Sequence, residues 1–122
     1  MTTKKILIVD DEAAIVAVLE ELLTEEGYTI IKAYNGLEAI SIFNKKQHID
    51  LMIVDYCMPH LNGRRVIETM RQNPRYSTTP VIVITGSEKQ FSNFPEDSTY
   101  QFLIEKPFNL ERITETVHKL LG

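Results

Sequence analysis

The strongest structural signal in the chain is ILIVDDE, at residues 6–12. Its four apolar residues are followed directly by three carboxylates. A strand without polar alternation is typical of a parallel sheet that helices cover on both faces. In such open α/β sheets, ligands bind beyond the carboxyl ends of the strands, so the acidic residues stand where a binding site is expected.

Two further apolar runs repeat this pattern. LMIV at residues 51–54 is followed by Asp55, and VIVI at residues 81–84 is followed by Thr85. Both runs have the length and the β-branched content of buried strands. Weaker strand signals at residues 29–33 and 102–104 bring the predicted number of strands to five.

Segments with helical periodicity separate these strands. The first covers residues 15–23 and ends at Gly27, the second begins at Asn35, the third ends before Asn73, and the last begins at Asn109. The segment at residues 87–97 fits a short helix or a loop equally well. This alternation of strands and helices predicts a doubly wound, mainly parallel α/β fold.

Composition narrows the class of protein. The chain has 122 residues, of which 43% are hydrophobic and 25% charged, and we expect one domain over residues 1–122. The single cysteine excludes an internal disulfide, and the net charge of −4 argues against direct binding to nucleic acid or to an anionic membrane. With neither a signal peptide nor a spanning segment in the sequence, we expect a cytoplasmic protein.

Five chemically active side chains follow the predicted strands. If the sheet is parallel, it collects Asp10, Asp11, Asp55, Thr85 and Lys106 at one edge. Close carboxylates repel each other by roughly 1–4 kcal/mol per pair, and Lys106 offsets only part of this charge. An oxygen-rich site of this kind suits Mg²⁺. The alternative is a plain lysine–aspartate salt bridge beside two solvated helix caps.

Asp55 is the expected nucleophile of this site. Carboxylates form aspartyl-phosphate intermediates when cations neutralise the phosphoryl oxygens. We expect Asp10, Asp11, Asp55 and the backbone carbonyl of Cys57 to bind the metal. Lys106 and the Thr85 hydroxyl are then left to contact the phosphoryl oxygens.

The joint pattern of these residues resembles the receiver domain of two-component response regulators, especially single-domain chemotaxis-type regulators. It is carried by DD at residues 10–11, D-x-x-M-P-x-x-x-G at 55–63, TG at 85–86 and KPF at 106–108. The resemblance implies a flavodoxin-like (βα)5 three-layer sandwich whose five-stranded sheet has the order 2-1-3-4-5.

The resemblance also implies a function in phosphorelay signalling. Asp55 would accept a phosphoryl group from the phosphohistidine of a sensor histidine kinase or a histidine phosphotransfer protein, with Mg²⁺ as cofactor. The modification would switch affinity for a downstream effector protein. Such a domain catalyses only its own phosphorylation and dephosphorylation, so we do not expect an enzyme that acts on external substrates.

Two positions depart from the family pattern. The family usually has an aromatic residue three positions before the lysine, where this chain has Leu103; Tyr100 and Phe102 lie nearby. Adjacent strand residues face opposite sides, so Phe102 does not replace it without a bulge or a shifted register. The second departure is Gly86, where the family more often has alanine.

Three other functions compete with this one. Aspartyl phosphohydrolases generally carry a second carboxylate two residues after the nucleophile, a position held here by Cys57. Nucleotide or flavin binding is disfavoured by the acidic residues at 10–12, which would repel phosphate. A receiver-like interaction module without phosphorylation stays open, as does the choice between a free-standing regulator and a part of a larger protein.

Overall fold

The computed structural model describes residues 3–86 and 99–122. Within these ranges the elements are β1 (Lys5–Val9), α1 (Ala13–Glu25), β2 (Thr29–Ala33), α2 (Gly36–Asn44), β3 (Leu51–Asp55), α3 (Gly63–Arg71), the 3₁₀ helix η1 (Pro74–Tyr76), β4 (Val81–Thr85), β5 (Phe102–Glu105) and α4 (Leu110–Leu121). The segment at 87–97, expected to be a short helix or a loop, lies outside the described residues.

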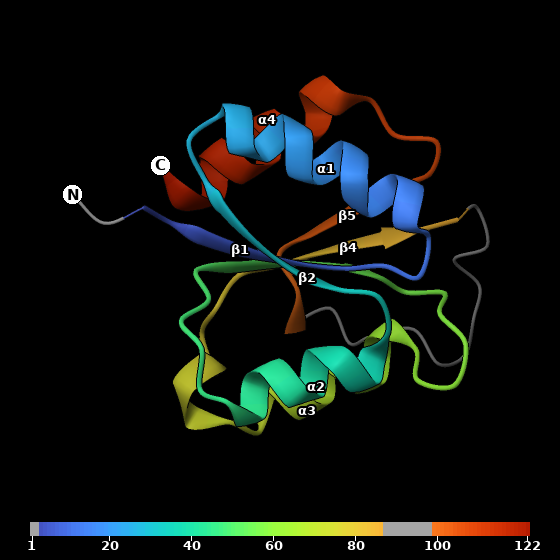
Figure 1. Cartoon of the computed structure of the whole chain (residues 1–122), viewed down its shortest axis with the longest axis vertical. Helices are drawn as coiled ribbons and strands as arrows, with labels where there is room; N and C mark the ends of the chain where they lie inside the picture. The colour runs from blue at the N-terminus through green and yellow to red at the C-terminus, as the bar shows by residue number, and fades with distance from the viewer. Residues whose placement is uncertain (1–2, 87–98) are drawn as a thin grey trace.

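The five strands form one parallel sheet in the order β2-β1-β3-β4-β5. Figure 1 shows α1 and α4 on one face of this sheet and α2 and α3 on the other. The predicted doubly wound, flavodoxin-like three-layer architecture and its strand order are therefore confirmed.

The apolar runs are buried because each strand contributes to two cores. In β1, Leu7 and Val9 pack in the core with α2 and α3, whereas Ile6 and Ile8 pack in the core with α1 and α4. Fully burying such a side chain contributes about 1.5–3 kcal/mol. Both faces of the strand must therefore be apolar, which explains the absence of polar alternation.

Side-chain caps fix where the helices begin. Asn35 accepts a hydrogen bond from the Glu38 backbone N–H at the start of α2, and Asn109 accepts from the first turn of α4. Asn62 caps α3 in the same way, by accepting from the Arg65 backbone N–H. At the end of α1, Gly27 has a φ of +97°, the left-handed conformation expected of a glycine at this position.

The register of β5 decides which core each of its residues enters. Leu103 pairs with Val83 and packs in the core with α2 and α3, where Tyr100 also packs. Phe102 packs in the opposite core, with α1 and α4. Phe102 and Leu103 therefore face opposite sides of the sheet, and Tyr100 is the nearby aromatic that shares a core with Leu103.

Candidate functional site

The site lies at the carboxyl ends of the central strands. Asp10 follows β1 directly, and Asp55 is the last residue of β3. Because Val9 lies beside Val54 in the sheet, the next residues along the two strands, Asp10 and Asp55, reach the same level. The Asp10 backbone N–H donates to the Ala33 carbonyl at 3.1 Å, which fixes this end of β1 against β2.

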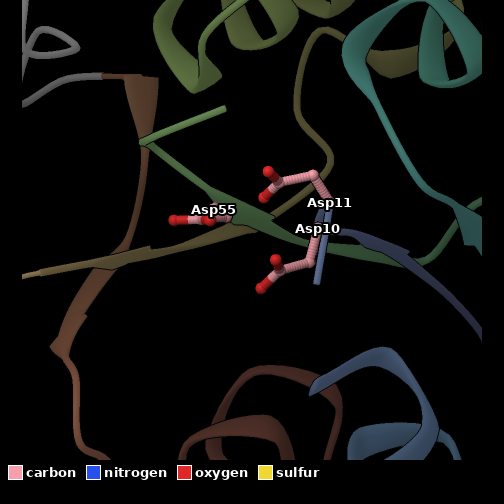
Figure 2. Close-up of side chains that lie close together, drawn as sticks. All are labelled: Asp10, Asp11 and Asp55. Carbon is pink, nitrogen blue, oxygen red and sulfur yellow. The ribbon is translucent and has the colours of Figure 1, made fainter. Parts of the chain in front are cut away.

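Three carboxylates gather at this edge. One carboxylate oxygen from each of Asp10, Asp11 and Asp55 lies within 4.8 Å of the others. Figure 2 shows these side chains at the ends of β1 and β3. Asp10 and Asp55 are only 2% and 3% exposed, whereas Asp11 is exposed to solvent. Two members of the cluster are thus buried in the edge of the sheet, and the third lies at the surface.

Lys106 brings a positive charge to the cluster from the residue after β5. Its Nζ lies 3.4 Å from Oδ2 of Asp55 and 3.7 Å from Oδ2 of Asp10. The nearest carboxylate, however, is Glu12, whose Oε1 is 2.9 Å from Nζ. Lys106 thus contacts three carboxylates, of which the predicted set of site residues did not include Glu12.

Burial and the neighbouring charges shift the pKa values of Asp10, Asp55 and Lys106. Burial raises the pKa of Asp10 to about 6, opposed by the hydrogen bond from the Glu12 backbone and assisted by the charge of Asp55. Burial also raises the pKa of Asp55, against the charge of Lys106. For Lys106, burial alone lowers the pKa, but the Glu12 hydrogen bond and the neighbouring carboxylates outweigh it and raise the pKa.

The donor set fits a hard divalent cation. Oδ2 of Asp10 is buried and accepts no hydrogen bond from the described residues, and the Lys106 Nζ stays 3.7 Å away from it. Leaving a charged oxygen buried without a hydrogen bond is costly, and a cation would remove that cost. Three carboxylates with one open side suit Mg²⁺, which uses few protein ligands and keeps several waters. The acidic cluster could therefore hold a metal.

The Thr85 hydroxyl does not contact the carboxylates in this structure. Thr85 is the last residue of β4 and is fully buried, and its Oγ1 has no hydrogen-bond partner among the described residues. Its backbone carbonyl accepts from the Lys106 N–H at 2.7 Å, which fixes the ends of β4 and β5 relative to each other. Thr85 and Lys106 are therefore linked through the main chain.

The loop after Asp55 is held against the site. The Cys57 backbone N–H donates to Oδ1 of Asp55 at 3.2 Å, and the Gly63 N–H donates to the Tyr56 carbonyl at 2.9 Å. Cys57 itself is exposed. The backbone of Cys57 is thus next to Asp55, but its role as a metal ligand through the carbonyl stays a prediction.

Glu12 is the carboxylate nearest to Lys106, and sequence reasoning did not include it in the site. Glu12 belongs to the acidic run at residues 10–12, but 94 positions separate it from Lys106 in the sequence. The two side chains meet because the parallel strands β1 and β5, which precede them, end at the same edge of the sheet. The Glu12 side chain is 59% exposed, so it borders the buried part of the site.

Fold and site together define a doubly wound α/β protein with an acidic, lysine-contacting cluster at the carboxyl edge of its sheet. The family model of the response regulator receiver domain matches residues 6–118 of this chain. The chain belongs to this family, as its motifs led us to expect.

Some relatives with similar sequences are about as long as this chain, and others are much longer. A chemotaxis protein CheY homolog of Campylobacter jejuni is 26% identical over 121 residues, which cover 97% of this chain and 92% of that protein. The probable transcriptional regulator ycf27 of Porphyridium aerugineum is 42% identical over 86 residues, 70% of this chain. The match spans 34% of the length of that regulator.

Solved structures of receiver proteins superpose on nearly the whole chain. The response regulator TrrA of Thermotoga maritima, in complex with Mg²⁺ and BeF, is 34% identical with a TM-score of 0.83, covering 97% of this chain and 99% of that one. The chemotaxis regulator CheY4 of Vibrio cholerae is 26% identical with a TM-score of 0.85, covering 98% of this chain and 99% of that one.

Within residues 3–86 and 99–122, no helix has the length and apolar content to cross a membrane.

Proposed function

We propose that Asp55 accepts a phosphoryl group from the phosphohistidine of a sensor histidine kinase or a histidine phosphotransfer protein. The observation that carries this proposal is the position of the Asp55 carboxylate, which is buried between two further aspartates and the Lys106 ammonium. A matching structure, that of TrrA, holds Mg²⁺ and BeF, and BeF has the shape of a bound phosphoryl group.

The transfer exchanges one bond for another. A carboxylate oxygen of Asp55 attacks phosphorus, a P–O bond forms, and the N–P bond of the phosphohistidine breaks. The departing histidine nitrogen keeps the electron pair and later takes a proton from solvent. Phosphoryl transfer depends mainly on positioning and on neutralising the phosphoryl oxygens, so the site must supply positive charge around Asp55.

We assign Mg²⁺ as the cofactor of this site. Asp10, Asp11 and Asp55 would hold it, with the backbone carbonyl of Cys57 as a further ligand. When bound, Mg²⁺ neutralises the carboxylates and the incoming phosphoryl oxygens. The carboxylate ligands must be ionised to bind it, and this favours binding above the raised pKa of Asp10.

Lys106 and Thr85 are the residues that we expect to sense the phosphoryl group. Lys106 already contacts Asp55 and can donate to a phosphoryl oxygen. The Thr85 hydroxyl is buried without a hydrogen-bond partner among the described residues, so a new acceptor nearby would attract it. Because the Thr85 carbonyl accepts from Lys106, movement of either residue affects both strand ends.

The output that we propose is a change in affinity for a downstream effector protein. In this role the receiver unit, residues 1–122, catalyses only its own phosphorylation and dephosphorylation. It acts in the cytoplasm without binding nucleic acid directly. Its net charge of −4 supports the last point, since DNA-binding surfaces are basic.

Intact mass spectrometry after incubation with acetyl phosphate and Mg²⁺ tests the assignment. We expect one added phosphoryl group, lost on treatment with hydroxylamine, and none in Asp55→Asn. Asp50→Asn is the matched control, because Asp50 stands at the opposite end of β3 and accepts from the Lys5 backbone instead. An unmodified wild-type protein would favour the phosphorylation-independent interaction module.

A further inference from the structure

We propose that Glu12 competes with Asp55 for the Lys106 ammonium and thereby slows phosphorylation of Asp55. Glu12 would act as a positioning residue, since it acts on the acceptor through Lys106. The inference rests on the proposed function of Asp55 as the phosphoryl acceptor, and it adds a rate-setting residue to that site.

The distances around Lys106 carry the argument. Its Nζ lies 2.9 Å from Oε1 of Glu12, but 3.4 Å from Oδ2 of Asp55. The shorter contact has the geometry of a strong charge-assisted hydrogen bond, whereas the longer one is near the limit for any hydrogen bond. The ammonium is therefore drawn toward the exposed carboxylate and away from the acceptor.

The position of Glu12 explains why its carboxylate is available for this contact. Glu12 is the N-cap residue of α1, but its side chain makes no capping hydrogen bond to the helix. Instead its backbone N–H donates to Oδ1 of Asp10 at 2.9 Å, which fixes the Glu12 main chain beside the carboxylate cluster. The side chain is thus anchored next to Lys106 and is not engaged by α1.

Phosphorylation requires Lys106 to serve a new acceptor. When a phosphoryl group enters, its oxygens lie beyond the Asp55 carboxylate, and Lys106 stabilises them only as far as Glu12 releases it. An exposed ion pair is worth at most about 1 kcal/mol, which is roughly fivefold in a rate. Loss of the Glu12 contact should therefore accelerate phosphorylation about two- to fivefold.

Three substitutions at residue 12 separate the contact from the charge. Glu12→Ala removes both. Glu12→Asp keeps the charge but shortens the side chain by one carbon–carbon bond of about 1.5 Å, which makes Asp55 the nearer carboxylate. Glu12→Gln keeps an acceptor oxygen without the charge. Glu21→Gln is the matched control, because it neutralises an exposed glutamate of α1 that is not among the ion-pair partners of Lys106.

The measurements are the initial rate of modification by acetyl phosphate at saturating Mg²⁺ and the dissociation constant for beryllium fluoride. We expect Glu12→Ala and Glu12→Asp to react two- to fivefold faster and to bind beryllium fluoride more tightly by a similar factor. Glu12→Gln should lie between them and the wild type, and Glu21→Gln should match the wild type. Circular dichroism establishes that each variant is folded.

Two results would overturn the inference while leaving the proposed function intact. A rate for Glu12→Ala equal to or below that of the wild type would show that Glu12 does not restrain Lys106. A wild-type rate in Glu12→Asp beside a fast Glu12→Ala would show that only the negative charge matters. If the wild type itself takes up no phosphoryl group, the proposed function fails, and this inference fails with it.

Discussion

A Cβ atom placed on Gly63 would lie 2.8 Å from the backbone carbonyl oxygen of Asp55. The same atom would lie 2.8 Å from Cα of Tyr56, so no side chain fits at residue 63 without a backbone shift. The glycine that closes the D-x-x-M-P-x-x-x-G motif is therefore required by the packing of α3 against the acceptor residue. It ties the position of Asp55 to the start of α3.

Gly63→Ala should destabilise the protein and slow phosphorylation together. Forcing a methyl group against backbone costs about 1–3 kcal/mol, and here the displaced atoms belong to the acceptor residue and its neighbour. Urea unfolding and the acetyl phosphate reaction measure the two effects. Gly36→Ala is the control: its Cβ would meet Cδ2 and Cβ of Leu61 at 2.7 and 2.8 Å, so it also strains the protein but not at the acceptor residue. An equal slowing of phosphorylation in the two variants would contradict this account.

Without a divalent ion, the stability of the protein should fall as the pH rises from about 4 to 7. Burial raises the folded-state pKa of Asp10 from 3.8 to about 6, so the folded protein holds a proton that the unfolded chain has released. That contribution, on the order of 3 kcal/mol at most, is complete below the unfolded pKa and is lost as the pH passes 6. Denaturant unfolding in EDTA at several pH values measures it. Asp10→Asn should flatten this part of the profile and be the more stable protein at pH 7.5.

Magnesium should make the wild type more stable than Asp10→Asn at pH 7.5, the reverse of the order expected in EDTA. A ligand that binds only the folded state stabilises it by about 2.7 kcal/mol at a concentration one hundred times its dissociation constant. We expect the wild type to gain stability with Mg²⁺ at pH 7.5 and Asp10→Asn to gain little, because it lacks a carboxylate of the cluster. Thermal unfolding with and without Mg²⁺ shows the difference. An equal gain in both proteins would place the metal elsewhere.

Much of the fold could be predicted because each local pattern agreed with the global architecture. The apolar runs identified β1, β3 and β4 since strands buried on both faces cannot alternate. The predicted ends of β3 and β4 were one residue short: Asp55 and Thr85 belong to the strands, because hydrogen bonds such as that from Tyr56 N–H to the Ile84 carbonyl extend the ladder. A sequence gives no sign of such a bond.

The site could be predicted only as far as strand order places residues at one edge. Asp10 and Asp11 follow β1, Asp55 ends the neighbouring β3, and the structure brings the three together. The partner choice of Lys106 could not be foreseen, because it depends on differences of half an ångström among carboxylates from distant segments. The capping role of Asn62 was also not identified, since a glycine and two arginines follow it and not an apolar stripe.

Lys106→Ala should impair the response to phosphate more than the binding of metal. The ammonium offsets repulsion among Asp10, Asp55 and Glu12, but it is also the one cation that contacts Asp55 among the ion pairs of the described residues. Its removal leaves the carboxylate ligands in place, and it takes away a positive charge that opposes Mg²⁺. The thermal shift caused by Mg²⁺ alone should therefore persist, while the additional shift caused by beryllium fluoride is largely lost.

Lys32→Ala provides the control for this variant, because Lys32 forms an exposed ion pair with Glu20 away from the cluster. Its shifts with Mg²⁺ and with beryllium fluoride should both equal those of the wild type. If Lys106→Ala lost the two shifts to the same extent, Lys106 would serve only to hold the carboxylates together. The selective loss, by contrast, follows from an ammonium that reaches Asp55 at 3.4 Å and can turn to the phosphoryl oxygens that Asp55 would carry.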